Sequence, residues 1–138
     1  MDRRVMILGA AGASALLLTG CLGAAEGEDF VGYWAHEKPV RQGEPARMLI
    51  AIKIERTGDA EFMATVVETS PFGRGVRSTS FALRYMPENR LALERHGQIF
   101  FLTIRDGALI MNDRPYRAST REEFDAFNAS LAGHPRFP

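Results

Sequence analysis

The stretch QIFFLTIRDGALIMN at residues 98–112 carries the clearest structural signal in this chain. Asp106-Gly107 separates two apolar runs, and an Asp-Gly pair in that position predicts a two-residue β-hairpin turn. His96-Gly97 gives the same signal just before the stretch, because glycine accepts the positive φ that such turns need. Gln98–Arg105 is apolar on both faces, which is typical of a strand covered on each side. Together these features predict three antiparallel strands between residues 91 and 112.

The chain upstream shows the same pattern of short strands and turns. Met48, Ile50, Ile52 and Ile54 alternate with polar residues, which predicts one buried face. No connection is long enough to hold a crossover helix, so all pairing is expected to be antiparallel. Further strands are predicted at Phe30–His36, Arg47–Glu55, Glu61–Thr69 and Arg77–Tyr85. The residues expected to point inward, into a filled or nearly filled interior, are Met48, Phe62, Phe81 and Phe101.

A single helix is expected after the strands. Ser119 and Glu122 have the spacing of a capping box, and Gly133 is a natural stop. Phe124, Phe127 and Leu131 recur at helical spacing and form an apolar stripe. A lone amphipathic helix of this length is unstable in water, so it should lie against the outside of the sheet or over one end.

These elements predict a mainly β fold with one C-terminal amphipathic helix. About seven strands form an antiparallel up-and-down meander, and closing it into a small barrel or a curved half-barrel removes exposed edges. A length of 138 residues with 46% hydrophobic and 25% charged residues predicts a single folded domain, at residues 30–138. The formal net charge of +0 argues against nucleic acid as a partner, and one cysteine excludes an internal disulfide.

The N-terminus has the features of an export signal. Arg3 and Arg4 precede an uncharged run at residues 5–18, and residues 1–20 are therefore predicted to be a cleaved signal peptide. The run ends in Leu18-Thr19-Gly20-Cys21, which resembles the lipobox of bacterial lipoproteins. This resemblance implies cleavage before Cys21 and lipidation of its thiol, with residues 21–29 as a lipidated N-terminus and flexible tether.

Other interpretations of the N-terminus remain open. The uncharged run extends to residue 25, so it could be a retained transmembrane anchor, or Cys21 could be present by chance in an ordinary secreted protein. The arginine pair fits a twin-arginine signal as well as a plain basic region. Every alternative places the domain outside the cytoplasm. By resemblance to lipoproteins, Leu22 after the cysteine favours the periplasmic face of the outer membrane over the inner membrane.

The mature domain also has a resemblance. Gly32-Tyr33-Trp34 in the first strand resembles the Gly-x-Trp start of lipocalins and related calycin barrels. The resemblance implies that Trp34 is a structural plug at one end of the barrel, with Arg114 or Arg117 lying over it. The chain departs from the family in lacking a Thr-Asp-Tyr turn, in its shorter length, and in having seven predicted strands rather than eight.

No recognisable catalytic, cofactor-binding or metal-binding set is present in the sequence. His36, His96 and His134 lack metal-ligand spacing, and no Gly-x-Ser-x-Gly motif occurs. Glu68 and Glu94 could do acid–base chemistry only if both faced into a barrel. The local cluster with most promise as an interaction loop consists of Phe72, Arg74 and Arg77.

The sequence therefore predicts a non-enzymatic, lipid-anchored binding or interaction module of the cell envelope. It is expected to need no cofactor and to meet the membrane through its lipid. Its other partner would be an envelope protein or a small apolar ligand. The alternatives are a lipocalin-like carrier, an immunity or inhibitor protein that neutralises an envelope partner, and an envelope hydrolase.

Replacing the single thiol tests the anchor. Cys21→Ser should accumulate as an unprocessed precursor that incorporates no labelled palmitate, because the thiol is the only group that can accept the lipid. Metabolic labelling and immunoblotting measure both properties. A mature, labelled product from this variant would contradict the assignment.

Overall fold

The structure is a computed structural model that describes residues 26–39, 41–69, 75–134, 136 and 137. A short 3-10 helix, η1 (Glu28–Phe30), precedes eight strands, and the helix α1 (Arg121–Ser130) and a short strand β10 (Arg136–Phe137) follow them. The eight strands are β2 (Gly32–Lys38), β3 (Arg47–Arg56), β4 (Glu61–Thr69), β5 (Val76–Met86), β6 (Arg90–Arg95), β7 (Gln98–Arg105), β8 (Ala108–Met111) and β9 (Arg114–Ser119).

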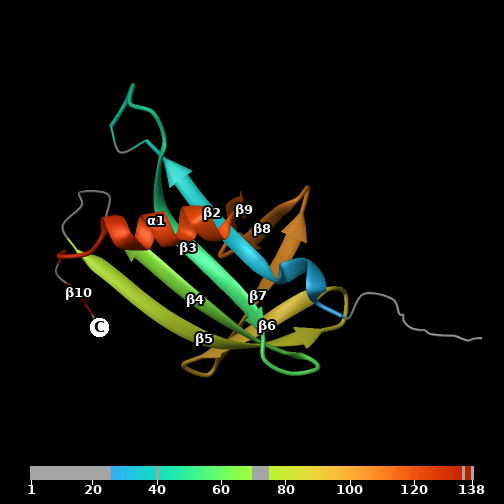
Figure 1. Cartoon of the computed structure of the whole chain (residues 1–138). Helices are drawn as coiled ribbons and strands as arrows, with labels where there is room; N and C mark the ends of the chain where they lie inside the picture. Colours follow the sequence, from blue (N-terminus) through green and yellow to red (C-terminus); the bar gives the residue numbers. More distant parts are fainter. Residues whose placement is uncertain (1–25, 40, 70–74, 135, 138) are drawn as a thin grey trace, which may run out of the picture.

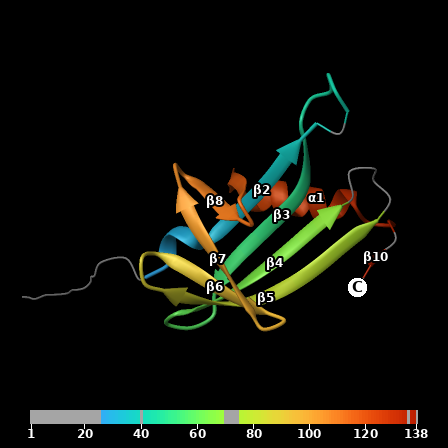
Figure 2. The ribbon, with the colours of Figure 1, turned by 180° about the vertical axis from the view of Figure 1, so that it is seen from behind.

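The strands form a closed up-and-down barrel. Each strand from β2 to β9 pairs with the next one in the chain, and β9 returns to pair with β2. Figures 1 and 2 show the sheet from opposite sides, with α1 lying across its outer surface. The predicted fold class, an antiparallel meander with one C-terminal helix, is confirmed, and the structure has eight barrel strands where about seven were expected.

The additional strand is β9. It follows a tight turn at Asn112 and Asp113, whose φ angles are 55° and 60°. This turn has the left-handed backbone of the His96-Gly97 and Asp106-Gly107 turns, but it contains no glycine to reveal it. Pro115 also lowers the strand signal, because proline cannot donate to a ladder. The pairing of β9 with β2 begins only at Arg117, so that ladder does not need the missing N–H.

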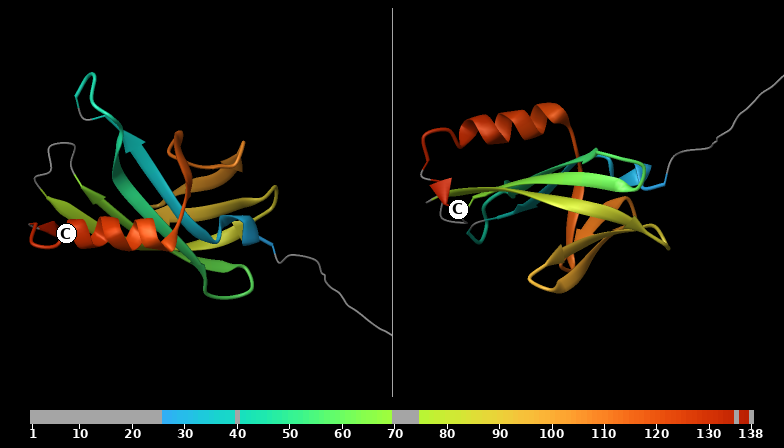
Figure 3. Two further views of the ribbon diagram at one scale, coloured as in Figure 1. Left: turned by 45° about the horizontal axis from the view of Figure 1, so that its top comes forward. Right: turned by 90° about the horizontal axis from the view of Figure 1, so that it is seen from below.

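The pairing of β5 with β6 is short for strands of this length. These strands share three residue pairs, from Arg84–Ala92 to Met86–Arg90. Beyond this point the two halves of the barrel diverge, as Figure 3 shows. At the far end of β5, β10 adds a parallel pairing with Val76 and Arg77. The expectation of purely antiparallel pairing was therefore wrong, because the long connection from β5 to β10, which ends in α1, brings β10 back beside β5 in the same direction.

The barrel interior holds the main hydrophobic core. A β-bulge changes which residues face it: His36 pairs with Ile50 and Glu37 with Met48, which leaves Leu49 unpaired. Leu49 and Ile50 therefore both lie in the inner cluster, whereas Met48 packs outside, beneath α1. The expectation that Met48 points inward was wrong for this reason. The other buried members of the inner cluster are Phe30, Trp34, Ile52, Ile54, Phe62, Ala64, Val66, Leu83, Leu91, Leu93, Leu102, Leu109 and Tyr116.

The outer face of β7 is uncovered. Phe62 is inside the barrel and Phe81 packs against the inner cluster, as expected, but Phe101 is 40% exposed and Ile99 is 61% exposed. Phe101 lies on the outer face because its neighbour Leu102 points inward. The guanidinium of Arg90 stacks over the Phe101 ring at 4.3 Å. The prediction that Gln98–Arg105 is covered on both sides was wrong.

The helix packs on the outside of the sheet, as expected. Phe124 and Leu131 are buried against β-strand residues in a second cluster, and Phe127 packs beside them. The capping residue is Thr120, whose hydroxyl accepts from the backbone N–H of Glu123 at 3.1 Å. The capping box predicted at Ser119 and Glu122 is therefore shifted by one residue.

One arginine joins the helix to the barrel. Arg117 of β9 binds both carboxylate oxygens of Glu37 on β2, at 3.0 and 2.8 Å, and both oxygens of Glu123 on α1, at 3.2 and 3.0 Å. Hydrogen bonding to Arg117 lowers the pKa of Glu37, and hydrogen bonding to Arg117 and to Ser119 lowers the pKa of Glu123. This bidentate pairing fixes the start of α1 against the strands that close the barrel.

The ion-pair cluster predicts a pH-dependent stability. Arg117→Gln should lower the melting temperature at pH 7, and the difference from the native chain should shrink as the pH falls below the ordinary glutamate pKa of 4.5. A carboxylate whose pKa is lowered by folding stabilises above the unfolded-state pKa, and this stabilisation disappears as the pH falls through the folded-state value.

Thermal unfolding followed by circular dichroism near neutral pH and near pH 3 measures the effect. Arg105→Gln, a change of an exposed arginine on β7, is the matched control and should show little difference at either pH. An Arg117→Gln deficit that stays constant with pH would contradict the account.

Candidate functional site

A cavity of about 320 Å³ lies in the end of the barrel formed by the turns at His96-Gly97 and Asn112-Asp113, which we call the mouth. Its volume is at the lower end of the range for small-molecule sites. The apolar lining residues are Ile50, Val66, Phe81, Leu93, Phe100, Leu102, Met111 and Tyr116. The polar lining residues are Glu68, Arg95, His96, Gln98, Asn112 and Arg114.

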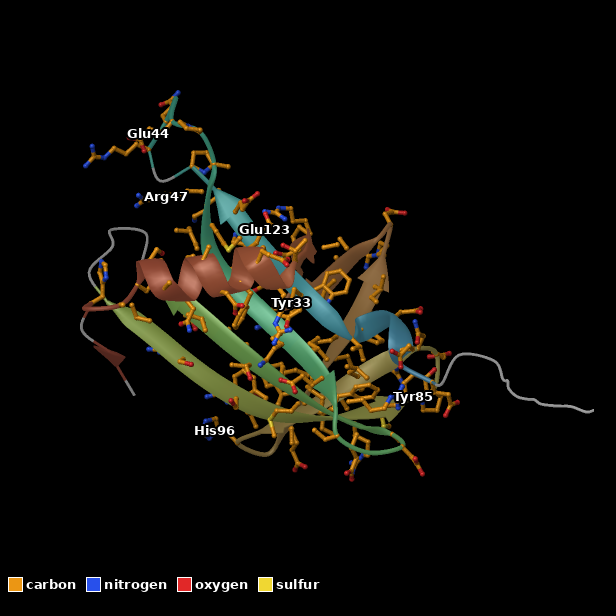
Figure 4. All side chains as sticks on the ribbon, in the orientation of Figure 1. Tyr33, Glu44, Arg47, Tyr85, His96 and Glu123 are labelled. Carbon is orange, nitrogen blue, oxygen red and sulfur yellow. The ribbon has the colours of Figure 1, made fainter. Side chains whose placement is uncertain are left out.

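The opposite end is filled. We call it the entry end because the polypeptide chain enters the barrel there. Phe30, Trp34 and Phe62 are buried there, and the indole Nε1 of Trp34 donates to the carbonyl of Phe30 at 3.0 Å. Gly27 lies against this packing with φ of 83°, and a Cβ there would come within 2.6 Å of Phe62. Figure 4 shows Tyr85 and His96 at the two ends of the barrel. The interior expected to be filled is therefore filled at one end and hollow at the other.

Alternation along the strands decides how the mouth is lined. On β4, β6, β7 and β9, inward positions near the mouth carry polar side chains, and the next inward positions are apolar. These polar-over-apolar pairs are Glu68 over Val66, Arg95 over Leu93, Gln98 over Phe100 and Arg114 over Tyr116. Successive inward residues lie two apart in a strand, so the cavity has a polar rim and an apolar floor.

Two arginines dominate the charge of the rim. The guanidinium of Arg95 lies 5.0 Å from the centroid of the Phe81 ring, across the seam between β6 and β5. Arg114 hydrogen-bonds the Tyr116 side chain. Within the described part of the chain, neither arginine forms an ion pair with a carboxylate. Two arginines against Glu68 leave one net positive charge on the described residues of the lining.

Tyr116 lies at the boundary between floor and rim. Burial raises the pKa of its phenol, hydrogen bonding to Arg114 lowers it, and the charge of Glu68 raises it, with burial dominant. Its ring also contacts His36, with centroids 5.6 Å apart. His36 Nδ1 is 3.3 Å from the carbonyl oxygen of Pro115. The phenol is therefore neutral at pH 7 and available to donate or accept a hydrogen bond in the cavity.

The structure places the residues singled out from the lipocalin resemblance in different surroundings. Trp34 is buried at the entry end. Arg117 lies on the outside with Glu37 and Glu123, and Arg114 lines the mouth, so the described contacts place neither arginine over Trp34. Sequence reasoning missed that Arg56, at the end of β3, stacks over Phe62 at 4.7 Å at the entry end.

The predicted interaction loop is described only in part. Phe72 and Arg74 lie outside the described residues, as does Cys21. Arg77 is exposed on β5, where it pairs in register with Glu68.

The carboxylates and histidines do not form a shared site. Glu68 lines the mouth, whereas Glu94 pairs with Ile99 on the outer face. In the described ranges, no group of three or more His, Cys, Asp or Glu side chains is arranged to hold a metal ion. Among the same residues, no helix is long and apolar enough to span a membrane.

Comparisons with known proteins add little. No family model and no curated protein matches the chain. A solved structure of lipoprotein YedD from Klebsiella pneumoniae subsp. pneumoniae aligns over 76% of this chain and 86% of that chain, with 11% identity and a TM-score of 0.40. Similarity at this level supports no statement about this chain.

Proposed function

We propose that this protein is a lipid-anchored binding module of the bacterial envelope, which holds a small ligand in the mouth of its barrel without transforming it. The observation that carries the proposal is the cavity of about 320 Å³ in an otherwise packed interior. A pocket that is mostly apolar with a few convergent polar groups is the usual form of a small-molecule site.

The direction of the chain supports the same proposal. Gly27, the second described residue, lies at the entry end close to Phe62 and Tyr85. An anchor at Cys21 would therefore hold the filled end toward the membrane and leave the mouth open away from it. The lipobox-like sequence and Leu22 support a position on the periplasmic face of the outer membrane.

A binding role accounts for the polar groups of the mouth better than a hydrolytic one. Among the lining residues that the structure describes, Glu68 has no second carboxylate beside it, which a paired acid–base mechanism needs, since Glu94 points outward. Tyr116 is buried with a raised pKa, which keeps its phenol protonated. These groups suit recognition of a ligand by hydrogen bonds and charge.

Filling the cavity tests the proposal. Met111→Trp should abolish saturable binding of the neutral apolar dye Nile red, because Met111 lines the mouth. Ile110→Trp is the matched control: it places the same side chain one residue away on the outer face of β8, and it should leave binding unchanged. Fluorescence titration of the two variants and the native chain measures the effect.

Absence of saturable binding to the native chain would contradict the proposal. Equal binding by the native chain and Met111→Trp would show that the dye binds elsewhere, and it would also count against the mouth as the site. The circular dichroism spectrum of each variant confirms that the barrel is intact.

A further inference from the structure

We infer that the ligand of the mouth is an amphiphile with one short apolar chain and an anionic head, in which Arg95 and Arg114 hold the head and the apolar floor holds the chain. This inference rests on the proposed function and specifies the chemical class of its ligand. It adds an anionic head to the small apolar ligand that the sequence led us to expect.

The order of residues along the strands indicates that the ligand is an amphiphile. At Glu68, Arg95, Gln98 and Arg114 the rim is polar, and one inward position deeper every one of these strands is apolar. A ligand that satisfies both layers must be polar where it meets solvent and apolar where it meets the floor. This arrangement suits a molecule inserted tail first.

The charges of the rim indicate that the polar head is anionic. Arg95 and Arg114 have no carboxylate partner among the residues that the structure describes. A guanidinium is charged at every physiological pH and presents five N–H donors in a planar fork that matches carboxylate and phosphate groups. The guanidinium carbon of Arg95 lies over the Phe81 ring, 5.0 Å from its centroid, and a cation–π contact of this kind uses none of the hydrogen-bond acceptors that the N–H groups need.

Glu68 is the only carboxylate among the described residues of the lining, and it sets the sign of a further test. It lies close enough to Tyr116 for its charge to act on the phenol. A cationic head would meet two like charges, on the arginines, and one opposite charge, on the glutamate. An anionic head would meet two opposite charges and one like charge. Glu68 should therefore weaken the binding of an anion, and removing its charge should strengthen it.

Four probes with the same octyl chain separate the contributions of head and tail: octanoate, octyl phosphate, octanol and octyltrimethylammonium. The processed chain, reconstituted in lipid nanodiscs, is titrated with each probe by calorimetry, and empty nanodiscs are titrated in parallel to subtract partitioning. Octanoate or octyl phosphate should bind about tenfold or more tightly than octanol, in line with one charge-assisted hydrogen bond. Comparing these two anions distinguishes a carboxylate from a phosphate head.

Variants assign the effect to residues. Arg114→Gln and Arg95→Gln should each weaken binding of the preferred anion by about tenfold and leave octanol unchanged, which also shows that the cavity is intact. Glu68→Gln should strengthen anion binding several-fold. Arg121→Gln, at the start of α1 and outside the cavity lining, is the matched control and should change neither affinity.

The outcomes separate the two proposals. Equal binding of octanol and both anions, or tighter binding of octyltrimethylammonium, would overturn the anionic head and leave ligand binding in place. Failure of all four probes to bind would overturn the inference, and it would overturn the proposed function as well only if Nile red also failed to bind. Weaker anion binding by Glu68→Gln would also contradict the inference, because it would make Glu68 a favourable contact.

Discussion

The structure depends on the pairing of the first barrel strand, β2, with the last barrel strand, β9. Tyr33, Trp34 and Ala35 of β2 pair with Ser119, Ala118 and Arg117 of β9, and this short ladder turns a meander into a closed barrel. Closure gives the chain an inside, which Trp34 helps to fill, and it removes two strand edges that would promote aggregation. The same pairing positions the helix, because the side chain of Arg117 binds Glu37 on β2 and Glu123 on α1. Fold, core and helix docking therefore share one physical origin.

The closed interior is filled by side chains at one end and hollow at the other. Large aromatic and branched side chains fill the entry end, where η1 caps the barrel and Gly27 lies too close to Phe62 for a side chain of its own. At the mouth the strands diverge, and the pairing of β5 with β6 stops after three residue pairs. The inward positions there are polar, and a cavity remains between them and the packed core. A filled end and a hollow end are thus built from one alternating pattern, because the inward residues change from apolar in the core to polar at the rim.

Local signals allowed most of the fold to be predicted. Glycine turns at residues 97 and 107 and the stripe of Phe124, Phe127 and Leu131 each depend on a few neighbouring residues, and these predictions are confirmed. Two features were missed. The turn before β9 contains no glycine to mark it, and the bulge at Leu49, which depends on the pairing of β3 with β2, reverses the direction of Met48. The exposed outer face of β7 was also missed, because an apolar sequence does not say whether anything covers it.

The candidate site was less accessible to prediction for the same reason. Arg95 and Glu68 can be recognised as site residues only once the strand register places both on the rim of the cavity. No sequence motif indicates that register. Arg114 was noted for a different role, over Trp34, whereas it lines the mouth. Cys21, Phe72 and Arg74 lie outside the described residues, so they stay predictions.

Methyl-detected NMR of the native chain during a titration with a short-chain amphiphile tests the central claim most directly. A barrel that is hollow at the mouth and packed at the entry end should show shifts concentrated at Val66, Leu93, Leu102 and Met111, with Ile54 and Leu109 nearly unchanged. Shifts centred on Ile54 and Leu109, or on Ile99 at the outer face, would contradict the account.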